Sequence, residues 1–165
     1  MSILPTTRIL LFIFLFALLS TTYNSFRNSG FQTFIVDKAT VPISAVLIHW
    51  LSPSEQVSAD GHSLVSPKVR LSVLNGCEGT EVMLMLIAAL ISIRMAWLRR
   101  LVGIFFGVVL VYLLNQLRIA TLYYCLSTRP FLFDTLHGYV FPVLIIAVIA
   151  LFIYWLQNER PAENF

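Results

Sequence analysis

The stretch that decides the fold is Asn75-Gly76-Cys77-Glu78-Gly79 together with the apolar run that follows it, TEVMLMLIAALISIRMAWL over residues 80–98. A polar segment with two glycines gives way there to the first of three long apolar stretches. The length of the run is typical of a helix that enters a membrane. Cys77 is therefore expected at a membrane surface and not inside a water-soluble core.

The composition of the whole chain places it in the same class. Of the 165 residues, 58% are hydrophobic and 12% are charged, and the mean hydropathy is +0.84. Water-soluble domains have fewer apolar and more charged residues than this. The net charge of +3 comes without a basic run, so the sequence gives no support to nucleic-acid binding. It predicts an all-α integral membrane protein.

Four membrane-spanning helices are predicted, because each crossing needs about 20 mainly apolar residues. They cover Ile9 to Phe26, Thr80 to Leu98, Leu101 to Leu126 and Tyr139 to Leu156. The chain then divides into four parts: an N-terminal anchor (residues 1–26), an extracytoplasmic and interfacial segment (27–79), a three-helix membrane core (80–156) and a cytoplasmic tail (157–165).

The first predicted span has a secretory signal peptide as its alternative interpretation, because its strictly apolar part runs only from Ile9 to Leu19. Residues 17–20, Ala-Leu-Leu-Ser, lack a clear small-x-small cleavage site, and Thr21 to Tyr23 can extend an anchor. An uncleaved anchor is the favoured interpretation.

The orientation follows from Arg99 and Arg100, which lie between the second and third spans in an expected tight helical hairpin. Short loops rich in Lys and Arg stay in the cytoplasm. The N-terminus is then inside, and residues 52–78 and 127–138 are outside. The rule is not fully obeyed, because Arg27, Lys38, Lys68, Arg70 and Arg129 also face outward in this arrangement.

The segment before Cys77 has partly soluble character. Residues Ala39 to Leu51 are expected to form a short apolar helix in the interface, since Pro42 and the length argue against spanning. Asp60-Gly61 between short runs is typical of a hairpin turn, which predicts two or three strands in the region of residues 56–74. This feature is too small for its own core, so we expect it to cover the surface around Cys77.

Two polar residues lie at the ends of the following apolar stretches. Arg118 falls inside the third predicted span, and His137 comes just before the fourth. A rise of 1.5 Å per residue from Leu101 places Arg118 about 5 Å below the outer edge of the hydrocarbon. Three helices thus bring a cysteine, an arginine and a histidine to one leaflet. These residue types suggest a nucleophile, a charge stabiliser and a proton carrier.

A cysteine or an arginine in a membrane protein can also have a purely structural role. Cys125 lies in an apolar context and is expected to be inert, whereas Cys77 has polar and glycine neighbours. A disulfide between the two is sterically possible but would leave Arg118 and His137 unexplained. An arginine inside a span is costly unless it faces the bundle interior or snorkels. Arg94, close to a predicted helix end, can simply snorkel.

The chain over residues 74–156 resembles the exosortase/archaeosortase family of membrane-embedded cysteine transpeptidases, and in size its short members such as the exosortase H type. The resemblance rests on a Cys-x-Gly motif that opens a membrane helix, here Cys77-Glu78-Gly79. An Asn-x-x-Arg motif follows in the next helix, from Asn115 to Arg118, and a histidine, His137, precedes the last one. Longer members carry more spans, and the N-terminal half here aligns with nothing residue by residue.

This resemblance implies the processing, at the outer leaflet of the plasma membrane, of secreted proteins that end in a recognition motif, one transmembrane helix and a basic cluster. Cys77 would attack the scissile carbonyl to give a thioester that a second nucleophile resolves. Arg118 would stabilise the oxyanion and lower the pKa of the thiol, while His137 would return a proton to the leaving amine. Asn115 and Glu81 are supporting candidates, although Glu81 also fits a solvated carboxylate at a helix start.

A non-enzymatic membrane subunit is the alternative class, with Asn115 and Arg118 binding a partner helix and Cys77 incidental. A scaffold would tolerate Cys77→Ser, whereas a thiol enzyme would not. A zinc membrane protease does not fit, since the chain has only three histidines and no His-Glu-x-x-His motif. The sequence shows no metal-ligand set, and no cofactor is expected.

Overall fold

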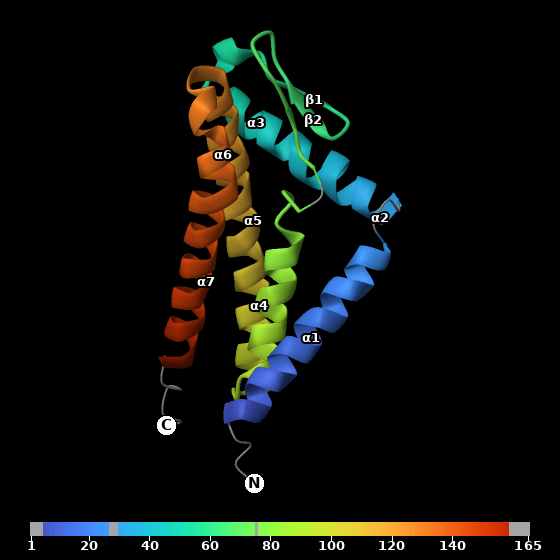
Figure 1. Cartoon of the computed structure of the whole chain (residues 1–165), viewed down its shortest axis with the longest axis vertical. Helices are drawn as coiled ribbons and strands as arrows, with labels where there is room; N and C mark the ends of the chain where they lie inside the picture. Colours follow the sequence, from blue (N-terminus) through green and yellow to red (C-terminus); the bar gives the residue numbers. More distant parts are fainter. Residues whose placement is uncertain (1–4, 27–29, 75, 159–165) are drawn as a thin grey trace.

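The structure is a computed structural model that describes residues 5–26, 30–74 and 76–158. Its main helices are α1 (Pro5–Ser25), α3 (Val41–Leu51), α4 (Thr80–Ser92), α5 (Trp97–Thr128) and α7 (Phe141–Asn158). Short elements connect them: α2 (Gly30–Thr33), η1 (Phe34–Thr40), η2 (Pro53–Glu55), η3 (Pro130–Leu132), α6 (Phe133–Thr135) and η4 (Leu136–Val140). Figure 1 shows α1, α4, α5 and α7 side by side, with α3 and the strands across one end. We call this the sheet end.

Four helical stretches of the described chain are long and apolar enough to cross a membrane. They are Thr6–Ser25, Phe34–Leu51, Trp97–Thr128 and Pro130–Asn158. The chain is therefore a multi-pass, all-α integral membrane protein, as the composition predicts. Three of the stretches contain most of the predicted first, third and fourth spans. The predicted second span does not reach its expected length, because α4 has 13 residues and measures about 20 Å.

The turn between α4 and α5 also differs from the expected hairpin at Leu98 to Leu101. The chain becomes extended at Ile93, and α5 begins at Trp97, so Arg99 and Arg100 lie in its first turn. The Arg100 guanidinium donates hydrogen bonds to the carbonyls of Leu90 and Ile93, at 3.2 and 3.1 Å. These carbonyls lack helical partners at the end of α4, and a cation is favoured there. Arg100 therefore stabilises an early end of the helix.

The helix before the strands is longer than the interfacial helix that the sequence predicts, and it is inclined. Elements η1 and α3 form one apolar helix over Phe34–Leu51. Pro42 lacks a backbone N–H, and the wide π-helical turns of η1 before it accommodate the missing hydrogen bond. Three hydrogen bonds connect this helix and the residue after it to α5: Tyr112 to the Ala39 carbonyl, Ser44 to Gln116, and Tyr124 to Ser52. Their positions on α5 span 12 residues, about 18 Å of rise, so the helix crosses the bundle obliquely (Figure 1).

The strands form a three-stranded antiparallel sheet in the order β1-β2-β3, as the Asp-Gly signal predicts. Strands β1 (Ser58–Asp60) and β2 (Ser63–Val65) pair with Asp60 opposite Ser63, and β3 (Arg70–Ser72) pairs with β2. Gly61 occupies the tight turn with a φ of +55°. The sheet has no separate core, because Leu64 and Leu71 pack into a cluster that includes residues of α3 and α5.

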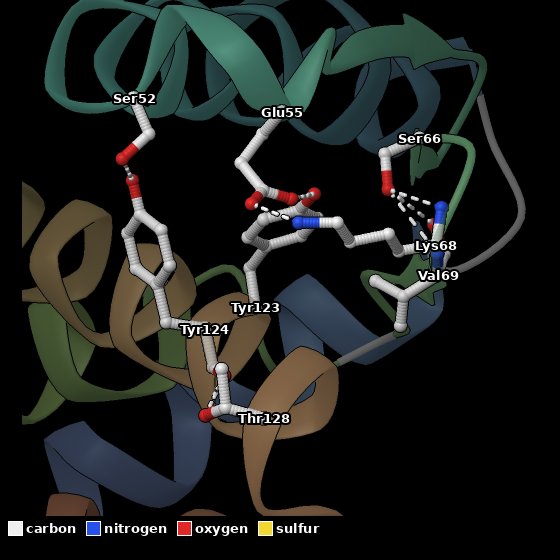
Figure 2. A network of polar contacts seen from close by, with 8 residues as sticks. All are labelled: Ser52, Glu55, Ser66, Lys68, Val69, Tyr123, Tyr124 and Thr128. Atoms are coloured by element: carbon white, nitrogen blue, oxygen red, sulfur yellow. Dashed lines mark hydrogen bonds and ion pairs between the residues drawn. The ribbon is translucent and has the colours of Figure 1, made fainter.

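A polar network fastens the strands and η2 to the end of α5 (Figure 2). Glu55 accepts a hydrogen bond from Tyr123 at 3.2 Å and forms an ion pair with Lys68 at 2.6 Å. Tyr124 donates to Ser52 beside it. Polar contacts as well as the apolar cluster thus hold the sheet end against α5.

A second apolar cluster joins α4, α5 and α7 away from the sheet. Its buried members are Leu86, Leu90, Val111, Ile145, Ile149 and Leu156. Gly103 and Gly107 of α5 allow the close approach, because a Cβ at these positions would lie 2.4 Å from a Leu156 methyl and 2.5 Å from a Leu86 methyl. Helices α4 and α7 therefore pack closely against α5, and this packing positions the first turn of α4 beside α5.

Candidate functional site

Cys77 lies in the short loop that leads from β3 into α4, at the sheet end. Its backbone N–H donates to the Leu74 carbonyl at 2.9 Å, which closes a turn, and Gly76 in that turn has a φ of +90°. The side chain is partly buried and packs against the cluster formed by α3, α5 and the sheet. The thiol therefore lies in a loop that packs against the sheet and α5.

Gly79 explains why the motif ends in glycine. It is the N-cap of α4 and has a φ of +82°, a conformation that side-chain-bearing residues rarely adopt. A Cβ there would also lie 3.0 Å from Cγ of Asn115. Asn115 in turn donates a hydrogen bond from Nδ2 to the Cys77 carbonyl at 3.0 Å. The Cys-x-Gly and Asn-x-x-Arg motifs are thus in direct contact.

Arg118 lies one turn beyond Asn115 on α5, and only 8% of it is exposed. One of its terminal nitrogens, Nη2, lies 3.4 Å from both Nδ1 and the backbone carbonyl oxygen of His137. Nε of Arg118 is buried and has no hydrogen-bond partner among the described residues. The Nε–H group of Arg118 is therefore a buried hydrogen-bond donor without a partner among the described residues.

His137 belongs to the π-helical element η4, and its ring completes the cluster. Nε2 lies 3.7 Å from the Cys77 sulfur, while Phe133 stacks on the ring with a centroid distance of 5.4 Å and an interplanar angle of 6°. π-Helical turns occur often at functional sites because they re-aim side chains. The structure thus brings together the three residues Cys77, Arg118 and His137, which the sequence singles out, and Asn115 supports the loop.

The proton position on His137 follows from its neighbours. Arginine can only donate hydrogen bonds, so the approach of Arg118 to Nδ1 leaves that nitrogen as the acceptor. The proton of the neutral ring is then on Nε2, toward the sulfur of Cys77. This tautomer can donate to a thiolate, but it is not arranged to remove a proton from the thiol.

The electrostatic environment of Cys77 combines opposing effects. Burial raises the pKa of the Cys77 thiol, because a low-dielectric surrounding disfavours the thiolate. The positive charge of Arg118 acts in the other direction and lowers the pKa, while the negative charge of Glu78 raises it. Burial is the largest of these effects on the pKa of Cys77, and Arg118 is the largest of those that favour the ionised form.

Two acidic residues near Cys77 differ in their placement. Glu81, the supporting candidate from the sequence, is exposed in the first turn of α4. Glu78 instead is buried, with 2% exposure, and accepts hydrogen bonds from the Tyr23 hydroxyl at 2.7 Å and from the Gly76 N–H at 2.6 Å. Sequence reasoning missed Glu78 and Tyr23. The available signal was an acid directly beside the cysteine and a tyrosine at the end of the first span.

Cys125 has a different environment from the residues around Cys77. It is buried in α5, and its thiol donates to the Arg129 carbonyl at 3.4 Å. Both cysteines are free, so the disulfide alternative is not formed in this structure. Within the described ranges, no three His, Cys, Asp or Glu side chains gather as a metal ion would require.

The geometry defines a thiol, an imidazole and a guanidinium gathered where the β3–α4 loop, α5 and η4 of a membrane helix bundle meet. Among known families, the model of the transmembrane exosortases matches residues 3–155, which is most of the chain. The protein belongs to the transmembrane exosortase family. No curated protein and no solved structure matches it.

Proposed function

We propose that this protein is a membrane-embedded cysteine peptidase and transpeptidase that cleaves the C-terminal sorting signals of exported proteins. The observation that carries the proposal is the contact of the Cys77 sulfur with Nε2 of His137 at 3.7 Å, with Arg118 on the other ring nitrogen. Membership in the transmembrane exosortase family supports the same class of reaction. Cys77 is the nucleophile, and His137 and Arg118 are its catalytic partners.

The chemistry proceeds in two acyl-transfer steps. The Cys77 thiolate attacks the scissile carbonyl, and the new C–S bond gives a tetrahedral oxyanion near the guanidinium of Arg118. Collapse breaks the C–N bond, and the departing amine takes a proton from Nε2 of the His137 imidazolium, which forms when the proton that Cys77 releases reaches the ring through water; the ring then returns to its neutral form. An acceptor amine or water then resolves the thioester. Transfer or release of the product depends on that second nucleophile.

The substrates in this proposal are secreted proteins that end in a sorting motif, one transmembrane helix and a basic cluster. Cys77 packs against the cluster that α3, the sheet and α5 form, so the site lies on the sheet side of α4, which suits a scissile bond held near a membrane surface. We place the sheet end on the extracytoplasmic face of the plasma membrane. Residues 80–156 form the catalytic core, and residues 27–79 the extracytoplasmic segment that covers it.

The scaffold alternative requires Asn115 and Arg118 to bind a partner helix. Both side chains are instead buried, at 1% and 8% exposure, and they contact Cys77 and His137 of the same chain. A partner helix packed on the outside of the bundle would not reach them. These contacts favour the enzyme over the scaffold.

The test is to co-express each cysteine variant with a tagged substrate that carries a C-terminal sorting signal, and to follow the substrate size by blotting. Cys77→Ala is expected to abolish processing. Cys125→Ala is the matched control, because it removes a buried thiol outside the cluster, and it is expected to process normally. Normal processing by Cys77→Ala at equal membrane abundance would refute the proposal.

A further inference from the structure

Glu78 is a buried carboxylate next to the proposed nucleophile that the mechanism above does not use. Only 2% of the residue is exposed, and both carboxylate oxygens have partners: Oε1 accepts from Tyr23, and Oε2 from the Gly76 N–H. A buried carboxylate is costly unless hydrogen bonds compensate for the lost water. The two bonds, at 2.7 and 2.6 Å, supply that compensation, one for each carboxylate oxygen.

The two partners connect separate parts of the molecule. Gly76 belongs to the turn that carries Cys77, whereas Tyr23 is 55 residues away and lies near the end of α1. Asn115 holds the same turn from the α5 side through the Cys77 carbonyl. The loop with the thiol is therefore fixed on two sides, by Glu78 with α1 and by Asn115 with α5.

The charges around the sulfur come from several elements. Glu78 is on the cysteine's own loop, Arg118 on α5 and His137 on η4, while Tyr23 of α1 contacts Glu78. Asp134 of α6 acts on His137, and Glu81 of α4 is exposed one turn further on. Of these groups, Arg118 and Glu78 act on the Cys77 thiol with opposite sign.

We propose that Glu78, held by Tyr23, is a positioning residue for Cys77 that fixes the loop from the α1 side and opposes the charge of Arg118 at the sulfur. This inference rests on the proposed function of Cys77. It makes α1 a part of the site rather than only an anchor. It also predicts that the charge of Arg118 lowers the pKa of the Cys77 thiol and that the charge of Glu78 raises it.

The experiment measures the rate of Cys77 alkylation by iodoacetamide against pH in membranes, in a Cys125→Ala background. Glu78→Gln preserves the contacts, since the amide oxygen can accept from Gly76 and the amide N–H can donate to the Tyr23 oxygen. It removes the negative charge, so the midpoint is expected to move to lower pH. Arg118→Gln is expected to move it to higher pH. Tyr124→Phe, which removes a tyrosine hydrogen bond to Ser52 outside the cluster, is the control and should leave it unchanged.

A second readout uses the processing of a sorting-signal substrate. Glu78→Ala and Tyr23→Phe are each expected to slow processing, because each removes the hydrogen bond between α1 and the loop, and the double variant is expected to be no slower than the slower single one, because the residues act as one unit. An unchanged or raised alkylation midpoint in Glu78→Gln would overturn the inference. So would single effects that multiply in the double variant. Alkylation needs no substrate, so it still decides the inference if the wild type processes no sorting signal and the proposed function fails.

Discussion

At the scale of single residues, the proposed site depends on which atoms face each other more than on which residue types are present. Arg118 faces Nδ1 of His137, and the proton of the ring therefore faces the sulfur of Cys77. The arginine carries the charge and the histidine carries the proton. Their removal should consequently affect different steps of one reaction.

A thioester trap separates these two roles. In His137→Ala, Cys77 can still attack with the charge of Arg118 in place, so a substrate adduct is expected to form slowly, with overall processing reduced by about 10²–10⁴-fold. Arg118→Ala is expected to give almost no adduct. Blots run without reductant, with and without hydroxylamine to cleave thioesters, measure this. Equal adduct levels in both variants would contradict the division of roles.

The charge of Arg118 is not its whole contribution. Its Nη2 lies 3.4 Å from two acceptors of His137, and its buried Nε has no hydrogen-bond partner among the described residues, so the guanidinium offers further donors in fixed directions that a lysine ammonium lacks. Arg118→Lys keeps the charge and loses the fork, so processing is expected to remain severely impaired. The alkylation midpoint of Cys77 in this variant should lie below that of Arg118→Gln, because a nearby cation lowers the pKa of the thiol. Wild-type processing by Arg118→Lys would show that charge alone suffices.

Gly79 offers a test of the contact between the two motifs. Gly76 and Gly79 both have positive φ, but only Gly79 has Asn115 within reach of a Cβ. Substitution by alanine costs about 1–2 kcal/mol for the conformation at either site, and Gly79→Ala adds the collision. Thermal unfolding in detergent is expected to show Gly79→Ala as the less stable variant. Equal melting temperatures would indicate that the loop and α5 are not in contact.

At the scale of elements, hydropathy predicts the helices α1, α5 and α7 and fails at the end of α4. Ile93, Met95 and Ala96 in the break are apolar and Arg94 is the single charge among them, so the apolar run continues almost unbroken into α5. The break depends on Arg100 reaching back to two carbonyls. The Asp-Gly pair does predict the strands, because turn chemistry is local. The burial of Glu78 was not predictable, since its partner Tyr23 is 55 residues away.

The end of α4 gives a prediction at this scale. Arg100→Ala removes both hydrogen bonds to the α4 carbonyls and is expected to lower the stability of the protein by about 1.5–3 kcal/mol for the loss of a charged donor. Arg99→Ala is the matched control. Arg99 lies in the same turn of α5 but makes no side-chain hydrogen bond within the described part of the chain. Chemical or thermal unfolding in detergent measures both. Equal loss in the two variants would contradict the capping role.

At the scale of the whole molecule, the sheet lies at one end of the bundle and the α4–α5 turn at the other (Figure 1), and the proposed site lies on the sheet side of α4, at the loop from β3. The beginning of α1 and the end of α7 share the end with that turn. One measurement of orientation therefore fixes the location of the site. The pair Arg99 and Arg100 predicts that the turn is cytoplasmic.

The orientation can be measured by single-cysteine labelling in intact cells with a membrane-impermeant maleimide, on a cysteine-free background. His62→Cys, in the exposed turn between β1 and β2, is expected to be labelled. Arg99→Cys is expected to remain unlabelled until the cells are opened. The reverse pattern would place the sheet end in the cytoplasm and exclude the processing of exported proteins.

The long separation between Cys77 and His137 has a consequence for how the protein is made. The two residues are 60 positions apart in sequence, and chains grow at about 5–20 residues per second during synthesis. The thiol thus emerges several seconds before its histidine, and only after α5 and η4 have been inserted does the site become complete. Until that moment the newborn chain carries a cysteine without its neighbouring imidazole and guanidinium, so the proposed site is assembled only when membrane insertion is nearly finished.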